Sequence, residues 1–221
     1  MNAYLKEYLK RGFITTDYGE RIGIAGEFIL KGEEVDAIKN YTSLCIRIPN
    51  QVVGVSNKFF NVYKGGSVLI VSKCGVGKTT FLRDLTRNIS VNINQNVVVV
   101  DERNEIASKS ENGGFFLGKT VDVLTFANKK YGFTHAIRSL NPSYIITDEL
   151  VTKNDFKGVS VAISGGVAVI ATMHGDEIQF QNYNILKNKR FSGFNYFIYI
   201  NKVENNRIIT AYDKNFNKYD C

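Results

Sequence analysis

Four short apolar runs alternate with helical patterns, and this alternation limits the chain to an α/β fold. The runs are SVLIV (67–71), VVVV (97–100), YIIT (144–147) and VAVIAT (167–172). Strands that are apolar throughout and alternate with helices are typical of a mainly parallel sheet covered on both faces. The sequence therefore predicts an α/β core that ends in a β-hairpin turning near residues 205–206.

Polar residues follow each of the four apolar runs. They occupy positions 72–79, 101–105, 148–149 and 172–174. Open α/β sheets bind their ligands beyond the carboxyl ends of the strands, which meet at one edge. Four strands that each deliver polar groups to this edge predict a functional site there.

The first of these polar segments, SKCGVGKTT (72–80), is a phosphate-binding loop with one unusual position. It fits the pattern G-x-x-x-x-G-K-[ST], except that Ser72 stands where the first Gly is expected. The loop lies between a buried strand and an amphipathic helix, which is the context that this motif requires. We therefore expect ATP and Mg²⁺ to bind here, with Ser72 tolerated because Ser adopts many turn geometries.

Each residue of the loop has an expected contact with the nucleotide. Lys78 is expected to contact the β- and γ-phosphates, Thr79 to bind Mg²⁺, and Thr80 to hold an α-phosphate oxygen. Backbone amides at the start of the helix add an anion site. The predicted nucleotide-binding residues are Ser72, Lys73, Cys74, Gly75, Val76, Gly77, Lys78, Thr79 and Thr80.

Acidic residues and a histidine at the same edge are candidates for catalysis. We expect Asp148 to hold Mg²⁺ through a water molecule and Glu149 to act as the general base, with Glu105 as the alternative base. His174 is expected to sense the γ-phosphate. For residues 101–103 the sequence leaves two readings open: binding of a metal water or a phosphate, or salt bridges among themselves.

Three arginines are candidates for a contact with phosphate, including one supplied to a neighbouring subunit. Arg138 lies on the predicted helix before Asp148, whereas Arg21 and Arg47 lie in the N-terminal part of the chain. An arginine supplied in trans is a recurring part of P-loop hydrolysis. The alternative for all three is an ordinary solvated charge.

The N-terminal part differs in pattern from the α/β core. Residues 1–12 have a helical pattern that Gly12 ends, and GERIGIAGEFIL and SLCIRIP have the pattern of strands. We therefore predict a small α+β module over residues 1–60 and the P-loop ATPase domain over residues 61–221.

Charge and cysteine content exclude several classes of function. The net charge is +7, but the basic residues are scattered, so nucleic-acid binding is not expected as the main function. The three cysteines, Cys45, Cys74 and Cys221, have neither metal-ligand nor disulfide-framework spacing. No apolar run is long enough to span a bilayer, so a cytoplasmic protein that reaches a membrane only through partners is expected.

The chain resembles the stage III sporulation protein AA family, a branch of the secretion and pilus motor ATPases. The resemblance rests on the segments GFITTDYGERIGIAGE, IRIPNQVVGVS, CGVGKTTFLRDL, VVVVDERNEIA, AIRSLNPSYIITDEL and GVAVIATMHG, in that order. It departs from the family pattern at positions 72–74, where Ser-Lys-Cys replaces Gly-Pro-Pro, and the segment before Gly12 is short.

This resemblance implies a RecA-like ATPase core that assembles as a homo-hexamer and energises a sporulation channel through integral membrane partners. Two alternatives remain open at this point. One is a nucleotide-gated scaffold with little or no turnover, and the other is a P-loop enzyme that acts on another substrate. Glu149 favours turnover, whereas Ser72 slightly favours the scaffold.

Overall fold

The computed structural model describes residues 12–16, 20–48, 50–109, 113–176, 189–204 and 206–219. The chain forms two compact units, the first Met1–Asn50 with Ser108–Phe115 and the second Gln51–Ala107 with Phe116–Cys221. The predicted boundary at residue 60 lies within helix α2 (Asn57–Val62) of the second unit. The predicted helix over residues 1–12 lies outside the described residues, apart from Gly12.

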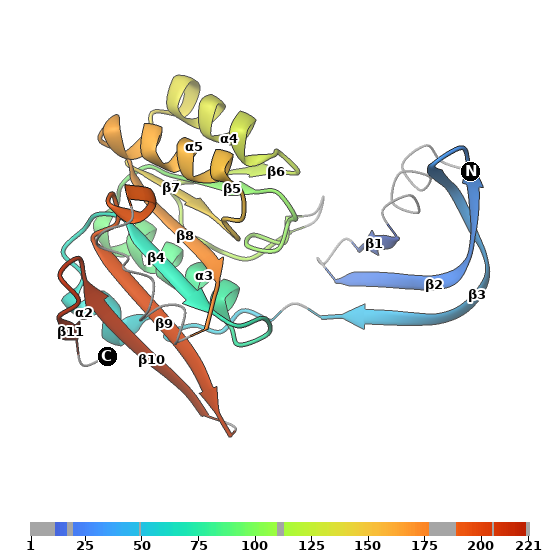
Figure 1. Ribbon diagram of the computed structural model, residues 1–221, viewed down its shortest axis with the longest axis horizontal. Coiled ribbons are helices and arrows are strands. Elements are labelled where there is room, and N and C mark those ends of the chain that lie inside the picture. Colours follow the sequence, from blue (N-terminus) through green and yellow to red (C-terminus); the bar gives the residue numbers. More distant parts are fainter. Residues whose placement is uncertain are drawn as a thin grey trace. The chain divides into compact units, whose positions relative to one another are not determined.

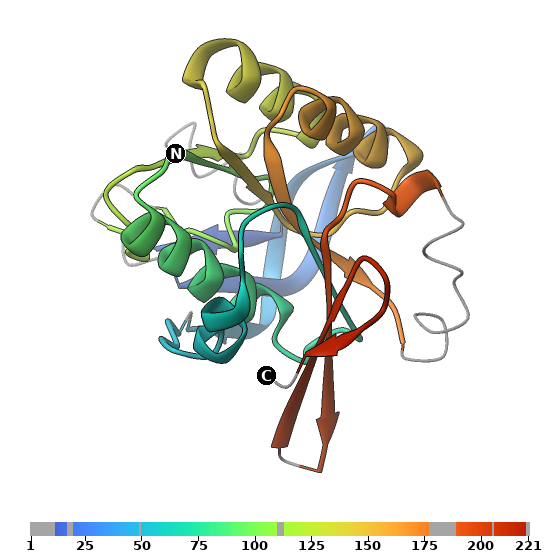
Figure 2. The same ribbon diagram turned by 90° about the vertical axis from the view of Figure 1, so that its left-hand side faces the viewer.

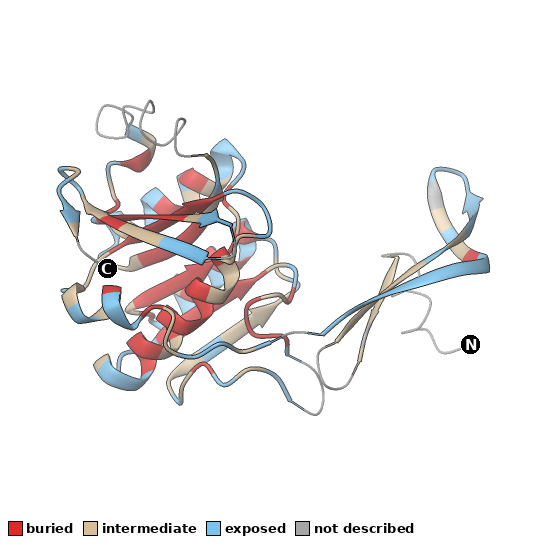
Figure 3. Ribbon diagram, turned by 90° about the horizontal axis from the view of Figure 1, so that it is seen from below, coloured by how far each residue is buried: buried red, intermediate tan, exposed pale blue. Residues whose placement is uncertain are grey.

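The first unit contains a three-stranded antiparallel sheet in the order β1-β2-β3. Its strands are β1 (Phe13–Thr15), β2 (Arg21–Lys31) and β3 (Glu34–Arg47). Irregular pairing at Ala25/Glu27 and Ile29/Leu30 interrupts the register of the β2–β3 hairpin. Among the described residues of this unit's sheet only Ile38 is buried. Figure 3 shows the contrast with the second unit, where buried residues concentrate in the sheet and the helices on it.

The second unit is built on an eight-stranded sheet in the order β11-β10-β9-β4-β8-β7-β5-β6 (Figure 1). The strands are β4 (Val68–Ser72), β5 (Val97–Asp101), β6 (Val121–Thr125), β7 (Tyr144–Thr147), β8 (Ala168–His174), β9 (Tyr196–Val203), β10 (Asn206–Asp213) and β11 (Lys218–Tyr219). All pairs from β9 through β4 to β6 are parallel, and β9–β10 and β10–β11 are antiparallel. The predicted mainly parallel sheet and the C-terminal hairpin are both confirmed.

Helices cover both faces of this sheet. Helices α2 and α3 (Lys78–Asn88) lie on one face, and α4 (Lys129–His135) and α5 (Lys153–Ser164) lie on the other (Figure 2). The π-helical turns Ile89–Ile93 and Ala136–Leu140 extend α3 and α4. Every residue of β4, β5 and β7 is buried, which explains the continuous apolar runs that lead to their polar last residues. No helix in the described ranges is long and apolar enough to cross a bilayer.

Local sequence signals fix where the helices begin. The Thr152 side chain accepts a hydrogen bond from Asp155 N, and Asp155 accepts one from Thr152 N, so α5 begins with a capping box. The Asn128 side chain accepts from Tyr131 N at 3.1 Å and caps α4. These caps set the ends of α4 and α5 that lie beside the carboxyl edge of the sheet, where the polar segments gather.

Candidate nucleotide-binding site

The phosphate-binding loop connects the end of β4 to the first residue of α3. Two of its glycines have left-handed backbone conformations, Gly75 with φ of 75° and Gly77 with φ of 119°. Ser72, in contrast, is the last residue of β4, pairs with His174 of β8 and does not have a positive φ. Its hydroxyl donates to Lys73 O at 2.9 Å. The loop therefore needs glycine at positions 75 and 77, while its backbone at position 72 accepts a side chain.

Lys78 is the centre of the hydrogen bonds around the loop. Its ammonium group donates to Ser72 O at 3.1 Å and to Lys73 O at 3.0 Å. Nδ1 of His174 lies 3.3 Å from the same nitrogen. Burial lowers the pKa of Lys78, and the nearby Cys74 and Glu149 oppose that shift. The lysine is thus buried against the backbone carbonyls of the loop.

Glu149 lies between the side chains of His174 and Arg103 at the same edge. Its Oε1 is 2.8 Å from His174 Nε2, and its Oε2 is 2.7 Å from Arg103 Nη1. The backbone of Glu149 has a φ of 30°, and its N–H donates to Thr172 Oγ1 at 2.8 Å. The structure therefore joins Lys78, His174 and Glu149 in one chain of contacts. Arg103, for which the sequence left two readings open, ends that chain.

Asp148 is buried and has an unsatisfied oxygen. Its Oδ1 makes no hydrogen bond with any described residue, and the nearest cation, Lys129 Nζ, is 3.7 Å away. Lys129 instead bonds Glu102 Oε2 at 2.8 Å. Burial raises the pKa of Asp148 to about 6, although Lys129 opposes this shift. The sequence analysis missed Lys129, which the capped start of α4 places at the carboxyl edge of the sheet.

Asp101 organises the acidic loop that follows β5. Its carboxylate accepts hydrogen bonds from the backbone N–H groups of Glu105, Ile106 and Ala107 at 2.8, 3.0 and 2.8 Å. Arg83 of α3 donates to Ile106 O at 2.7 Å and to Glu105 O at 2.8 Å. Burial raises the pKa of Asp101, and its backbone hydrogen bonds oppose that shift. Asp101 therefore fixes the conformation of the loop. The hydrogen bond from Arg83 to the backbone carbonyl of Glu105 holds Glu105 beside α3.

A hollow of about 270 Å³ lies beside the start of α3. Its lining residues are Gly54, Val55, Lys58, Phe59, Phe81, Arg207 and Ile209. Arg207 of β10 connects this hollow to the loop, because its Nε donates to Val76 O at 2.8 Å. The sequence gave no sign of this contact, which joins residues far apart in the chain.

The three candidate arginines lie in two different units. Arg21 and Arg47 are directly opposite each other in strands β2 and β3 of the first unit, and the Arg21 guanidinium lies 3.5 Å over the Phe13 ring. Arg138 belongs to the π-helical turn that ends α4 in the second unit. Arg138 is therefore separated along this helix from Lys129, which is the helix residue at the carboxyl edge.

The residues present fit a Mg²⁺ ion that is held mainly by phosphate and water. Within the described ranges, no three His, Cys, Asp or Glu side chains gather to hold a metal. Mg²⁺ in nucleotide sites usually takes only one or two protein ligands. The unsatisfied Oδ1 of Asp148 is a suitable acceptor for a metal-bound water, and Thr79 is the second residue of α3, at the end of the loop.

Comparisons with known proteins identify the family and the fold. The family model of sporulation stage III, protein AA matches residues 1–218. Stage III sporulation protein AA of Bacillus subtilis strain 168 is 34% identical over 180 residues, which cover 77% of this chain and 58% of that protein. The chain therefore spans less than two thirds of the length of that relative.

Solved structures show which fold this is. The ATPase DotB of Yersinia pseudotuberculosis matches 97% of this chain and 65% of its own, with a TM-score of 0.59 and 16% identity. The pilus retraction motor PilT with bound ADP matches 96% and 66%, with a TM-score of 0.58 and 16% identity. VirB11 of the Brucella suis type IV secretion system matches 93% and 75%, with a TM-score of 0.51 and 14% identity.

These likenesses assign the α/β fold to the RecA-like fold of secretion and pilus ATPases. The family match covers nearly the whole chain and includes the loop, the acidic strand ends and His174. The chain belongs to the family of sporulation stage III protein AA.

Proposed function

We propose that this chain binds ATP and Mg²⁺ and hydrolyses ATP as a secretion-type motor ATPase of a sporulation channel or secretion complex. The observation that carries the proposal is the chain of contacts from Lys78 through His174 to Glu149. Through His174, the cation proposed to bind phosphate is connected to the carboxylate proposed to accept a proton, which supports this assignment.

The loop and Lys78 supply the phosphate site. Backbone N–H groups at the start of α3 point toward an anion, and the helix dipole favours negative charge there. Lys78 now donates to two backbone carbonyls, Ser72 O and Lys73 O, and would exchange these contacts for the β- and γ-phosphates. Bound phosphate would also favour the charged form of Lys78, which burial disfavours.

Glu149 is the proposed general base. His174 and Arg103 hold its two oxygens, which fixes the direction of the carboxylate. Hydrolysis requires an oriented water at the γ-phosphate and an acceptor for its proton. Thr79 and Asp148 would hold Mg²⁺, which when bound neutralises charge on the phosphates. His174 contacts both Lys78 and Glu149, so it is placed to report whether a γ-phosphate is present.

The hollow beside α3 is the proposed site of the nucleoside. It is lined by two aromatic side chains, Phe59 and Phe81, and lies next to the loop through Arg207. A site that combines aromatic side chains with the charged groups of Lys58 and Arg207 suits a nucleoside, whereas the loop takes the phosphates. The two sites together account for a nucleoside triphosphate as the ligand.

We further propose that the protein works as a homo-hexamer in the cytoplasm, on integral membrane partners. The support is the family and the likeness in fold to secretion ATPases. A nucleotide-gated scaffold is the second candidate. It is favoured by the contacts of both Glu149 oxygens with His174 and Arg103, because a carboxylate held in this way must be released before it can accept a proton from water.

The test compares ATP binding and phosphate release in the wild type, Lys78→Ala and Lys119→Ala. Lys78→Ala removes a charge-assisted contact and should abolish both activities. Lys119→Ala makes the same change at an exposed position just before β6, outside the proposed site, and should leave both activities unchanged. Binding without release in the wild type would select the scaffold. Unchanged calorimetric affinity in Lys78→Ala would contradict the proposed site.

A further inference from the structure

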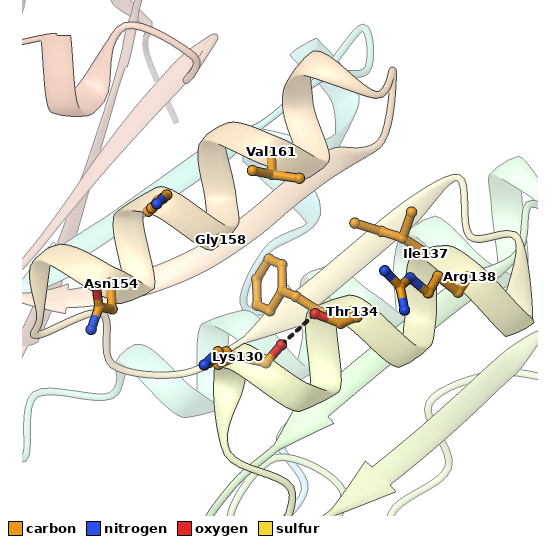
Figure 4. A pocket seen from close by; sticks show the side chains of 9 residues that line it. Lys130, Thr134, Ile137, Arg138, Asn154, Gly158 and Val161 are labelled. Atoms are coloured by element: carbon orange, nitrogen blue, oxygen red, sulfur yellow. Dashed lines mark hydrogen bonds between the residues drawn. The ribbon is translucent and has the colours of Figure 1, made fainter.

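A groove on the face of the second unit formed by α4 and α5 lies apart from the contacts of Lys78, His174 and Glu149 described above, although one candidate arginine, Arg138, lines it. It measures about 480 Å³ and is lined by side chains of both helices. Figure 4 shows Thr134, Ile137 and Arg138 from the α4 side and Asn154, Gly158 and Val161 from the α5 side. Lys130 and Arg138 lie eight residues apart along the α4 side, which corresponds to about 12 Å, or roughly two helical turns.

The floor of the groove is apolar. Phe133 and Ile137 contribute from the α4 side, and Val161 contributes from α5. Val161 is 59% exposed, which is unusual for a valine beside a buried phenylalanine. Gly158 has no side chain to cover the floor, and a Cβ at this position would lie 3.8 Å from the Phe133 ring. The missing side chain leaves room at this position, and the apolar surface accessible to a ligand comes from Ile137 and Val161, because Phe133 is buried.

The rim of the groove is basic. Lys130, Arg138 and Lys157 are all exposed and line the groove, and its lining contains no acidic residue. Among the described residues no carboxylate pairs with any of these three cations. An apolar floor between unpaired cations complements a ligand that has apolar side chains flanked by carboxylates.

We propose that this groove docks an amphipathic helix of a partner protein, with leucine-like residues on one face and Glu or Asp on its flanks. An amphipathic helix that lays its apolar face in a groove between two helices is a common mode of peptide recognition. Two turns of such a helix match the length of the groove, and its flanking carboxylates reach the three cations. The groove is thereby a partner site separate from the nucleotide edge.

The probe is a fluorescein-labelled peptide of about 18 residues, since helices shorter than about 12–15 residues are marginal in water. It carries Leu at i, i+3, i+4 and i+7 and Glu on both flanks. Two control peptides have the same composition in scrambled order, or Lys in place of Glu. Fluorescence anisotropy with the whole chain should show saturable binding of the first peptide alone, weakening as salt rises. No saturable binding, or equal binding of the scrambled peptide, would overturn the proposal.

Two variants separate the charged rim from the apolar floor. The triple variant Lys130→Glu, Arg138→Glu, Lys157→Glu should weaken binding at least about tenfold, the combined effect of three exposed ion pairs. The triple variant Lys119→Glu, Lys202→Glu, Lys218→Glu makes the same change in net charge elsewhere and should not weaken it beyond about twofold. Equal weakening in both would show unspecific attraction and contradict the docking site.

The floor is tested with Gly158→Met, which fills the groove with a side chain. Met favours a helix more than Gly does, so a loss of peptide binding in this variant cannot come from an unstable α5. Hydrogen exchange on the wild type should show peptide-dependent protection over Lys129–His135 and Lys153–Ser164. Protection elsewhere would contradict the proposal. The proposal would also be contradicted if the wild type bound phosphatidylserine vesicles and the triple variant of the rim lost that binding while peptide binding persisted. A change in oligomeric state that this variant abolished while peptide binding persisted would contradict it in the same way.

Discussion

The unusual residue of the phosphate-binding loop is explained by its backbone. Ser72 extends β4 by one residue, and its side chain is buried beside the carbonyl of Lys73, to which it donates. The left-handed turns that the loop needs fall on Gly75 and Gly77. A glycine at position 72 would therefore relieve no strain, which makes the loss of this glycine compatible with an intact loop.

The first prediction follows from this geometry. Ser72→Gly should leave the ATP affinity within about tenfold of the wild type, a difference of 1.4 kcal/mol. It should lower the free energy of unfolding by roughly 1–2 kcal/mol, through a lost hydrogen bond and a more flexible unfolded chain. Isothermal calorimetry and urea unfolding measure the two effects. A large gain in ATP affinity would show that Ser72 damages the loop.

The second prediction concerns the proposed base. Glu149→Gln keeps the shape of the side chain but cannot accept a proton, so phosphate release should fall by about 10²–10⁴-fold while ATP still binds. Single-turnover assays measure the chemical step. Glu105→Gln is the comparison, because Glu105 lies on the neighbouring acidic loop. If phosphate release falls in Glu105→Gln and is unchanged in Glu149→Gln, the general base is Glu105 and not Glu149.

Sequence reasoning identified the residues that have local motifs and missed those that act over long distances. Lys78, Glu149 and His174 each follow a strand within a short recognisable pattern, and the structure brings them together. Lys129 and Arg207 are an ordinary helix residue and an ordinary strand residue in sequence. Their contacts with Asp148 and Val76 exist only because the sheet places separate elements at one edge.

At the scale of elements, complete burial made the central strands predictable. Strands β4, β5 and β7 are buried on both faces, so their sequences carry continuous apolar runs. Strand β6 lies at the edge of the sheet and contains the exposed Asp122, so it lacks such a run and was missed. The π-helical ends of α3 and α4 were missed because their apolar spacing matches that of an ordinary helix.

The third prediction concerns the contact that fixes α3 to the segment before α2. The Asp84 carboxylate accepts hydrogen bonds from Gly54 N, Ser56 N, Ser56 Oγ and Arg87. Burial by itself raises the pKa of Asp84, but these hydrogen bonds lower it overall. A carboxyl group whose pKa is lower in the folded than in the unfolded state stabilises the fold above its unfolded pKa. This stability is lost as the pH falls through the lower folded pKa.

Asp84→Asn should therefore lower the free energy of unfolding at pH 7 by about 1–3 kcal/mol. It should also flatten the loss of stability below pH 4, because the titrating group is gone. Urea unfolding from pH 7 to pH 3 measures both effects. Asp122→Asn makes the same chemical change at an exposed position of β6 and should change neither. If the free energy of unfolding of Asp84→Asn fell as steeply below pH 4 as that of the wild type, the assignment of this pH dependence to Asp84 would be contradicted.

At the scale of the whole molecule, the two units differ in how many of their apolar side chains are buried. The second unit has a continuous core on the face of the sheet covered by α4 and α5, with Val71, Val100 and Phe156 among its members. The sheet of the first unit leaves Leu44, Ile46 and Phe28 exposed. Among the described residues of this sheet only Ile38 is buried, so the sheet contributes little apolar core. The sequence predicted two modules but gave no measure of this exposure.

The fourth prediction is that turnover depends on assembly, with an arginine that reaches the γ-phosphate of a neighbouring subunit. Arg138 lies nine residues beyond Lys129, about 14 Å along its helix, so it is remote from the edge proposed to bind phosphate in its own subunit. Arg21 and Arg47 belong to the first unit and are the other donors to be tested. Arginines supplied in trans contribute about 10³–10⁵-fold in other P-loop proteins.

Mixing experiments test this dependence and identify the donor. Lys78→Ala subunits lack a working loop, and Arg47→Ala subunits keep theirs, so each alone should be nearly inactive if Arg47 is the donor. Their mixture should regain phosphate release, because some interfaces then join an intact loop to an intact arginine. The mixture is then prepared with Arg21→Ala or Arg138→Ala in place of Arg47→Ala. The arginine variant that is inactive alone and regains phosphate release with Lys78→Ala identifies the donor. A specific activity that stays constant on dilution to a monomer, measured by light scattering, would leave no place for a trans arginine, since a single subunit would then complete its own site.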